Sequence, residues 1–447
     1  MGRLQIAWVG ICLAAAMAAC GGDEAKVVCG AGTHAEGGSC LADLVSAPVC
    51  GTGTERVDGV CVAAALVACG EGTEQVGDEC VPINTLACGD GTHEEGGACV
   101  PDLATEVAPA VLGRLLYFDT NLSTPAGQSC ASCHTPDTGF ADPDQQLPVS
   151  RGVHPWLFGK RNSPTAAYAA YSPDFHYDAV EGLYQGGQFW DGRALDLVAQ
   201  AQGPYLNPSE MGTVDAAALV AKVAASDYAD LFEAVYGPGS LADAATAYVQ
   251  VAEAIAAYES SPEVNRFTSK FDFYLAGEAT LTAQEASGLA LFNASDKGNC
   301  AACHLSTAEG TIPALFTDFT YDNLGAPRNP DNPFLGLGPE YNPDGANFID
   351  LGLGGALGET AENGKFKVPT LRNVAATPPY MHNGVFNTLQ EVVQFCNARD
   401  LGGFPPPEVA ENVNTVEVGN LGLTADEVLD LVAFLETLSD GYVPDGS

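Results

Sequence analysis

The chain has 447 residues, of which 57 are Asp or Glu and only 17 are Lys or Arg, so its formal net charge is −40 at pH 7. This excess of negative charge argues against nucleic acid as a partner and favours a basic or neutral protein partner. Residues 104–447 are long enough to form two domains with cores of their own.

The N-terminus predicts export. Arg3 precedes an apolar run, Ile6 to Ala19, which is too short to span a membrane but suits a signal peptide. Small residues lead into Cys20 and two glycines follow, which resembles a lipoprotein signal. We therefore expect residues 1–19 to be a signal peptide and Cys20 to carry a lipid anchor, placing the protein in the cell envelope, in the periplasm or at the surface. The alternative is an ordinary signal peptide cleaved nearby, with Cys20 paired elsewhere.

The region 20–103 contains four copies of one small cysteine-rich unit. Each copy opens with Cys-Gly-x-Gly-Thr, and the spacing between its two cysteines is constant; the pairs are Cys29 and Cys40, Cys50 and Cys61, Cys69 and Cys80, and Cys88 and Cys99. Such a unit is too small to bury a core, so we expect a disulfide within each repeat. The repeats are interpreted as a spacer from the membrane, with a specific docking role as the alternative.

Two Cys-x-x-Cys-His motifs carry the chemistry. They are formed by Cys130, Cys133 and His134, and by Cys300, Cys303 and His304. In this pattern two thiols bond a haem covalently and the imidazole ligates its iron. A zinc site made from both cysteine pairs is the alternative, but the pairs lie far apart and each is followed by a His. The sequence therefore predicts two covalently bound c-type haems.

The predicted fold is mostly α-helical, with two cytochrome-c-like haem domains and long irregular loops behind the disulfide-stapled repeats. Residues 110–118 show helical periodicity ahead of the first haem motif. Thr282 and Glu285 form a capping-box pattern that opens a helix to Phe292, and residues 424–438 predict a closing amphipathic helix. Gly and Pro crowd 308–358. We expect an N-terminal haem domain over 104–281 and a C-terminal haem domain over 282–447.

Six further segments give residues 110–440 a resemblance to the bacterial di-haem cytochrome c peroxidase and MauG superfamily. Together these segments are specific, although each alone would be weak. They are Arg161-Asn162-Ser163-Pro164-Thr165, Phe189-Trp190-Asp191-Gly192-Arg193-Ala194, Gln200-Ala201-Gln202-Gly203-Pro204, Asn207-Pro208-Ser209-Glu210-Met211, Phe366-Lys367-Val368-Pro369-Thr370-Leu371-Arg372-Asn373-Val374 and Pro379-Tyr380-Met381-His382-Asn383-Gly384.

The resemblance implies a peroxide-dependent oxidoreductase with hydrogen peroxide as substrate, in which the N-terminal domain is peroxidatic and the C-terminal domain transfers electrons. Glu210 matches the distal acid–base residue of the family, which moves a proton between the peroxide oxygens, and Gln200 matches its neighbour. Trp190 matches the tryptophan that relays electrons or holes between the haems. The alternatives are a solvated surface charge for Glu210 and a core side chain for Trp190.

The resemblance also implies a calcium ion between the domains. Asn162, Thr377 and Pro379 match a site made of one side chain and backbone carbonyls, and oxygen donors suit calcium. It implies as well a protein partner in the envelope, either an electron donor or a protein substrate. Whether the chain forms a homodimer stays open.

Cys396 departs from the family pattern. Family members place a Met or a Tyr ligand for the second haem fourteen residues after the His that matches His382, and this position is Cys396 here. It is also the one cysteine of the fifteen left after the signal, lipid, repeats and haems take theirs. We expect Cys396 to ligate the second haem iron as a thiolate; Met381 is the alternative ligand, and a buried spectator thiol is the other reading.

The expected axial ligands of the two haems bear on the function. An anionic ligand lowers the haem potential and favours higher oxidation states, which favours MauG-like oxidation of a protein substrate over peroxide removal fed by a small cytochrome. His154, eight residues before Asn162, has the spacing of a loop His that blocks the first haem in conventional peroxidases; an ordinary loop His is the alternative. A non-enzymatic electron-transfer cytochrome is the remaining class, and Glu210 and Gln200 argue against it.

Overall fold

The computed structural model describes eight short strands between residues 33 and 101 and the continuous chain from 108 to 444. The chain divides into two compact units, residues 1–100 and 101–447. The predicted lipid anchor at Cys20 and the signal peptide lie outside the described residues, so both stay predictions.

The strands of the N-terminal unit form four two-stranded hairpins, one in each cysteine-rich repeat. In the first three hairpins the second cysteine of the repeat lies opposite the same strand position, at Ala35, Arg56 and Gln75. The side chains of these strands lie outside the described residues, so the disulfides stay a prediction. The strands are β1 Thr33–Glu36, β2 Ser39–Ala42, β3 Thr54–Val57, β4 Val60–Ala63, β5 Thr73–Val76, β6 Glu79–Pro82, β7 Thr92–Glu95 and β8 Ala98–Pro101.

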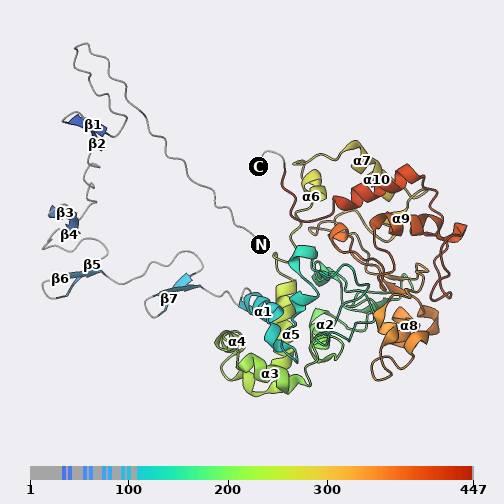
Figure 1. Ribbon diagram of the computed structural model, residues 1–447, viewed down its shortest axis with the longest axis horizontal. Coiled ribbons are helices and arrows are strands. Elements are labelled where there is room, and N and C mark those ends of the chain that lie inside the picture. Colours follow the sequence, from blue (N-terminus) through green and yellow to red (C-terminus); the bar gives the residue numbers. More distant parts are fainter. Residues whose placement is uncertain are drawn as a thin grey trace, which may run out of the picture. The chain divides into compact units, whose positions relative to one another are not determined.

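The unit that follows is mostly helical with long irregular connections, as the sequence predicts (Figure 1). Its strands are short: β9 His176–Asp178 pairs with β10 Leu183–Gln185, and β11 Tyr321–Asp322 pairs with β12 Phe366–Lys367. Its α-helices are α1 Ala108–Phe118, α2 Leu197–Leu206, α3 Ala216–Ala224, α4 Ala229–Tyr236, α5 Ala244–Glu259, α6 Lys270–Leu275, α7 Ala283–Asn293, α8 Gly352–Leu357, α9 Leu389–Ala398 and α10 Ala425–Glu436.

The predicted helix boundaries are confirmed at their caps. Thr282 caps α7 and forms a reciprocal capping box with Glu285, and Thr424 caps α10 in the same way with Glu427. These pairs satisfy backbone N–H groups that the first helical turn leaves without partners. The helix ahead of the first haem motif begins at Ala108, slightly before the predicted start.

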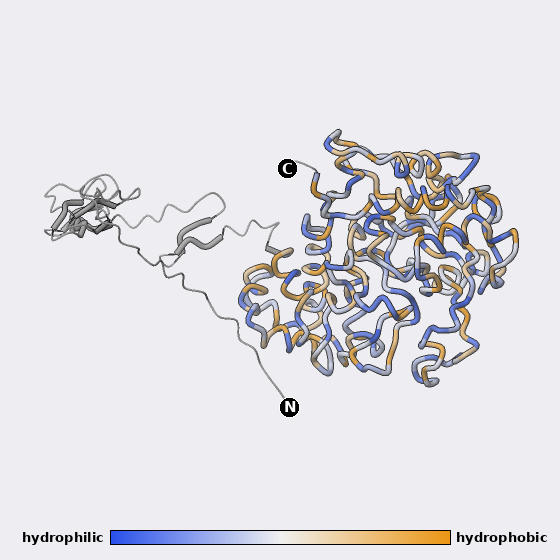
Figure 2. Tube along the Cα trace, turned by 45° about the horizontal axis from the view of Figure 1, so that its top comes forward, coloured by the Kyte–Doolittle hydropathy of each residue, from blue (hydrophilic) through white to orange (hydrophobic). Residues whose placement is uncertain are grey.

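Two hydrophobic cores support the two halves of this unit. The first gathers α1, α2, α3 and α5 around residues such as Leu116, Tyr205 and Ile255. The second gathers α7, α9 and α10 around Phe292 and Phe434, and it includes Phe271 of α6, ahead of the expected boundary after residue 281. Hydrophobic and hydrophilic residues are intermixed along the chain of this unit (Figure 2). None of the helices in the described part is both long and apolar enough to cross a membrane.

A glycine permits close helix contact in each half. A Cβ atom at Gly113 in α1 would collide with the carbonyl oxygen of Ala254 in α5, and one at Gly288 in α7 would collide with the carbonyl oxygen of Asp430 in α10. The α1–α5 and α7–α10 pairs, which lie side by side in Figure 1, therefore depend on the missing side chain. The equivalence of the two contacts indicates that the halves repeat one packing scheme.

We predict that Gly288→Ala lowers the free energy of unfolding by about 1–3 kcal/mol, the usual cost of overpacking, because α10 must move to admit the methyl group. Thermal or denaturant unfolding of the haem-loaded protein measures the change. Gly336→Ala is the matched control, since a Cβ atom there meets nothing within 4 Å. Equal stabilities of the two variants would contradict the close contact.

Candidate functional site

The two haem motifs have the same local backbone. Each begins with a short 3₁₀ turn, Cys130–Ser132 in the first and Cys300–Ala302 in the second. The backbone N–H of His134 donates to the carbonyl of Cys130, and that of His304 donates to the carbonyl of Cys300, both at 2.9 Å. The turn therefore places both thiols and the imidazole of one motif along the wall of one cavity.

Each imidazole is oriented by one backbone carbonyl. Nδ1 of His134 lies 3.2 Å from the carbonyl oxygen of Phe140, and Nδ1 of His304 lies 2.8 Å from that of Phe316. Both phenylalanines have a left-handed backbone, with φ of 60° and 54°. An Nδ1–H that donates to a carbonyl leaves Nε2 with the lone pair that binds a metal, so both rings are set in the iron-ligating tautomer.

A threonine supports the orienting carbonyl in each half. Thr165 Oγ1 donates to the carbonyl of Gly139, directly before Phe140, at 2.6 Å. Thr370 Oγ1 donates to the carbonyl of Leu315, directly before Phe316, also at 2.6 Å. Both threonines belong to the family segments, and these hydrogen bonds give them a role that the sequence alone did not show.

The first cavity brings together most of the predicted site residues of the N-terminal half. His134, Trp190, Gln200 and Glu210 line it with both cysteines of the motif. Gln200 projects from α2, which Asp196 caps, and Glu210 follows the end of the same helix. The cavity therefore offers an imidazole, a carboxyl and an amide to one small molecule bound beside them.

Glu210 is held in place by the turn after α2. Its backbone N–H donates to the carbonyl of Asn207 at 3.0 Å, and the Asn207 side-chain amide donates to its carboxylate at 2.8 Å. Burial raises the pKa of Glu210 above its usual range, although the charge of Arg193 and the bond from Asn207 oppose that shift. A carboxyl with a raised pKa can both give and take a proton near neutral pH.

Trp190 lines both cavities, so it lies between the two candidate haem sites. Its indole N–H donates to the carbonyl of Asn162 at 2.8 Å. The next residue, Asp191, pairs with Arg161 at 2.6 Å, and Arg161 also pairs with Asp350 at 2.6 Å. These almost fully buried ion pairs fix the segment that carries the indole.

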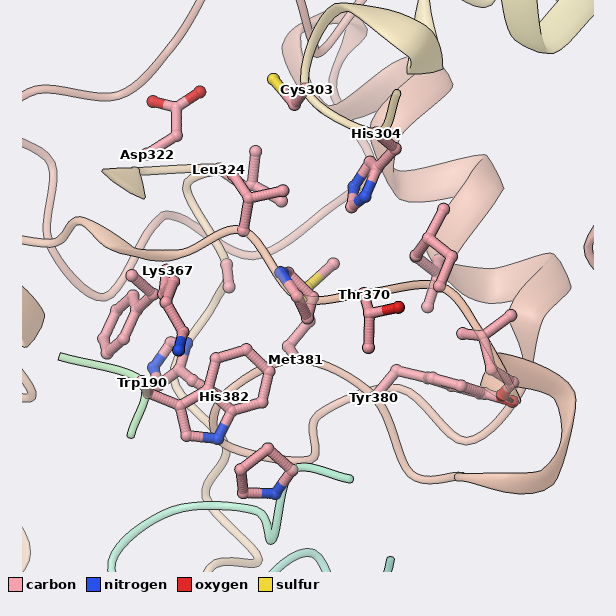
Figure 3. A pocket seen from close by; sticks show the side chains of 18 of the residues that line it. Trp190, Cys303, His304, Asp322, Leu324, Lys367, Thr370, Tyr380, Met381 and His382 are labelled. Carbon is pink, nitrogen blue, oxygen red and sulfur yellow. Dashed lines mark hydrogen bonds between the residues drawn. The ribbon is translucent and has the colours of Figure 1, made fainter. Parts of the chain in front are cut away.

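The second cavity, shown in Figure 3, contains both predicted candidates for the axial ligand. Cys396 lines it from α9, and Met381 lines it from the loop before that helix, where its side chain points toward His304 (Figure 3). Cys396 has no disulfide partner among the described residues. Burial raises the pKa of its thiol to about 11, with Arg399 opposing, so the thiol is protonated unless a metal displaces the proton.

His154 lies apart from the first cavity. Its ring stacks on Trp156 at 5.0 Å, in a loop of which Trp156 is largely exposed, and it is not among the residues that line the cavity. The neighbouring Val153 N–H donates to the carbonyl of Glu210 at 2.7 Å, so this loop does border the distal residue. Ligation by His154 would require its ring to leave Trp156 and stays a prediction.

The predicted calcium ligands Asn162, Thr377 and Pro379 all line the second cavity. The Asn162 amide donates to the carbonyl of Pro148 at 3.2 Å, which turns that nitrogen away and leaves its side-chain oxygen for a cation. The structure therefore brings the three residues into one region, and the calcium ion itself stays a prediction.

Two titratable residues that line the cavities were missed by the sequence analysis. Lys367 lines the second cavity beside Trp190 (Figure 3), and its ammonium donates to the carbonyl of Gly187 at 2.6 Å. Burial lowers its pKa to about 7. Glu259 lines the first cavity from the end of α5, and burial raises its pKa to about 8. Lys367 lies in one of the segments that resemble the family, so its position could have pointed to the site. Glu259 lies in no such segment, and nothing in the sequence around it indicated a role.

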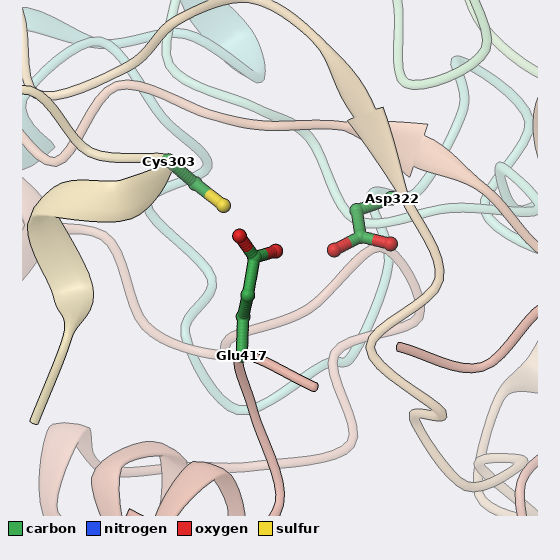
Figure 4. Close-up of side chains that lie close together, drawn as sticks. All are labelled: Cys303, Asp322 and Glu417. Carbon is green, nitrogen blue, oxygen red and sulfur yellow. The ribbon is translucent and has the colours of Figure 1, made fainter. Parts of the chain in front are cut away.

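Cys303, Asp322 and Glu417 form a cluster with metal-ligand spacing, shown in Figure 4. Asn414 donates to both carboxylates, at 2.6 and 2.8 Å. Because Cys303 belongs to the second haem motif, its sulfur is committed to a thioether bond. The cluster is therefore part of the edge of the second haem site rather than a separate metal centre.

The two cavities fit c-type haem. Each presents two cysteines and one histidine whose Nδ1 already donates a hydrogen bond. Pro164 and Thr165 line the first cavity, and Pro369 and Thr370 line the second. Ser163 Oγ lies 3.3 Å from Nε2 of His134, the nitrogen that would bind iron. Within the described residues the two motifs line different cavities, so their two cysteine pairs do not come together to bind one zinc ion.

Comparison with known proteins gives consistent results. The family model described as di-haem cytochrome c peroxidase matches residues 108–280. The chain is 43% identical over 354 residues to the methylamine utilization protein MauG of Paracoccus denitrificans, an alignment that covers 74% of this chain and 89% of the relative. It is 32% identical to the cytochrome c551 peroxidase of Nitrosomonas europaea, over 75% of this chain and 81% of that protein.

Solved structures show the same similarity. The diheme peroxidase BthA from Burkholderia thailandensis superposes with a TM-score of 0.67 at 35% identity, covering 76% of this chain and 89% of that chain. A MauG-like protein associated with microbial copper homeostasis superposes with a TM-score of 0.56 at 30% identity, covering 74% of this chain and 89% of that chain.

Proposed function

The chain belongs to the di-haem cytochrome c peroxidase and MauG family, and on that basis we propose that it reduces hydrogen peroxide at the cavity of His134 and draws the electrons from a protein substrate in the cell envelope. The observation that carries the proposal is the joint position of Glu210, His134 and Trp190 around one cavity, with Trp190 also lining the second.

The residues of the first cavity supply binding and proton transfer. The haem iron supplies the redox chemistry that breaks the O–O bond. Glu210, as a carboxylate, would accept a proton from one peroxide oxygen and return it to the other, which leaves as water. Gln200 lines the same cavity and would orient the peroxide by hydrogen bonding. Over the full cycle, peroxide takes two electrons and two protons and gives two waters.

Two alternatives remain distinct from this proposal. A conventional cytochrome c peroxidase would take its electrons from a small cytochrome and would need its first haem released from His154 by reduction. An electron-transfer cytochrome would need no distal acid, and Glu210 argues against it. MauG-like oxidation is favoured because Cys396, and not a methionine, stands at the position on α9 that matches the family's axial ligand, although Met381 lines the same cavity.

Three further assignments complete the proposal. Asn162, Thr377 and Pro379 bind a calcium ion beside Trp190, supported by their place along one cavity. The protein is a lipoprotein anchored through Cys20, with the disulfide-stapled repeats as its spacer, supported by the signal pattern and the repeated hairpins. A homodimer stays open.

We predict that Glu210→Gln slows peroxide consumption by about 10²-fold or more, the scale for losing a positioned acid–base group, while both haems stay bound. In the wild type the rate should fall as the pH falls through the raised pKa of Glu210, because the proton-accepting carboxylate is then lost; the variant should lack this fall. Glu263→Gln, at an exposed carboxylate paired with Arg114, is the control. A wild-type rate in Glu210→Gln would favour the electron-transfer cytochrome.

A second prediction concerns the ligand of the second haem. Cys396→Met should raise the reduction potential of that haem and change its low-spin EPR signal, because a neutral thioether replaces an anionic thiolate. The signal of the first haem should persist. Met381→Leu is the matched variant in the same cavity and should leave both signals in place. A change in Met381→Leu alone would identify Met381 as the ligand.

A third prediction separates the two enzymatic readings. Oxidised protein mixed with one equivalent of peroxide in a stopped-flow instrument should react directly, because His154 lies outside the cavity and stacks on Trp156. His154→Gly should react at a similar rate. If the wild type is inert until reduced by one electron, and His154→Gly removes that requirement, the protein is a conventional peroxidase.

A further inference from the structure

A column of aromatic rings leads from the surface hairpin β9–β10 into the interior. Tyr177 is half exposed, and its ring centroid lies 5.0 Å from that of Tyr184 on the opposite strand. Tyr184 lies parallel to Phe175 at 5.4 Å, with only 4° between the ring planes. Phe175 in turn meets Tyr321 edge-on at 6.0 Å. These centroid distances fall within the range of interacting aromatic pairs.

The inner end of the column meets the segment of Trp190. A Cβ atom at Gly192 would collide with the Tyr321 hydroxyl and lie 2.7 Å from Cε2 of Phe175, so this backbone, two residues after Trp190, contacts both rings. Tyr321 also pairs in the sheet with Lys367, whose N–H donates to the carbonyl of Trp190 at 2.9 Å.

The inner end also adjoins the second cavity. Asp322, the residue after Tyr321, lines that cavity next to Cys303 (Figure 4). The hairpin is tied to this strand, because Gln185 bridges Thr320 and the Gly186 N–H donates to the carbonyl of Phe319 at 2.9 Å. Backbone hydrogen bonds therefore hold the column in place, and it connects the surface to the region between the two haem sites.

Only one tyrosine of the column has a base for its proton. A tyrosine gives up its phenolic proton when it loses an electron, because the oxidised phenol is far more acidic than the neutral one, whose pKa is about 10. The Tyr184 hydroxyl donates to the carboxylate of Glu359, at 3.2 and 3.3 Å. The Tyr321 hydroxyl donates to the backbone carbonyl of Gly186, which is not a base, and Tyr177 has no hydroxyl hydrogen bond within the described chain.

We propose that Tyr184 is the site at which the peroxide-oxidised enzyme takes electrons from its protein substrate, an inference that rests on the proposed function. One electron passes from Tyr184 through Phe175 and Tyr321 to the oxidised interior, and the phenolic proton passes to Glu359. The resulting tyrosyl radical takes one electron from an oxidisable side chain of the partner and recovers its proton from Glu359. Two such transfers supply the two electrons that one peroxide consumes.

The charge around Tyr184 indicates the kind of partner. Four acidic residues, Asp174, Asp178, Glu181 and Glu359, are carried by or adjoin this hairpin, while Tyr177 and Val180 expose apolar surface on it. A partner that presents basic side chains around an aromatic residue would match this surface in charge and polarity.

The test uses the haem-loaded full chain with one equivalent of peroxide, no partner and a nitroso spin trap, followed by peptide mass spectrometry. We expect a trap adduct on Tyr184. Tyr184→Phe, which keeps the stacked ring, should lose the adduct and lengthen the lifetime of the peroxide-oxidised state several-fold. Glu359→Gln should lower the adduct yield with Tyr184 present. Tyr274→Phe is the matched control, since Tyr274 is exposed and outside the column.

Several outcomes would overturn the inference. Adduct on Tyr177 or Tyr274 in place of Tyr184, or an unchanged lifetime in Tyr184→Phe, would exclude Tyr184 as the exit. A wild type that reaches the peroxide-oxidised state without any tyrosine adduct would overturn this inference and leave the proposed function standing. A wild type that does not react with peroxide at all would overturn both.

Discussion

The hydrogen bond from imidazole Nδ1 to a phenylalanine carbonyl is the constraint on which both haem sites depend. Phe140 and Phe316 reach the left-handed backbone that aims their carbonyls at His134 and His304, and a threonine hydroxyl holds the preceding residue in each case. Without that bond either ring could turn, and the nitrogen facing the cavity would not be fixed. The repetition of this arrangement, together with a glycine helix contact in each half, shows that the unit is built from two copies of one local design.

What differs between the copies gives each cavity its chemistry. The first cavity has a carboxyl, Glu210, held by the turn after α2, whereas the second is lined by two sulfur side chains, Cys396 and Met381. A carboxyl with a raised pKa suits proton transfer to a small oxidant, and sulfur suits a closed haem that only exchanges electrons. Trp190, fixed by the Arg161, Asp191 and Asp350 ion pairs, lies where the two cavities meet. The carboxyl of one cavity and the sulfur side chains of the other are thereby separated in space, and one indole lines both cavities.

The sequence predicted those parts of the site that depend on local spacing. The haem motifs, the capped helices α7 and α10, and the grouping of Trp190, Gln200 and Glu210 follow from motifs a few residues long. The orienting carbonyls could not be predicted, because Phe140 and Phe316 stand at different distances along the chain from their histidines. Lys367, Glu259 and the aromatic column were missed for a related reason: their roles arise from burial and from contacts between distant segments, such as Phe175 with Tyr321.

Lys367 shows how tertiary packing adjusts the electrostatics around Trp190. A fixed positive charge beside an indole would oppose removal of an electron from it, because the charge of the oxidised ring and that of the ammonium repel each other. Burial lowers the pKa of Lys367 to about 7, so near neutral pH the ammonium can release its proton at little cost. The neighbouring Asp191, which favours the charged lysine, is itself neutralised by Arg161 and Arg193. Lys367 therefore places near Trp190 a positive charge that burial makes easier to remove.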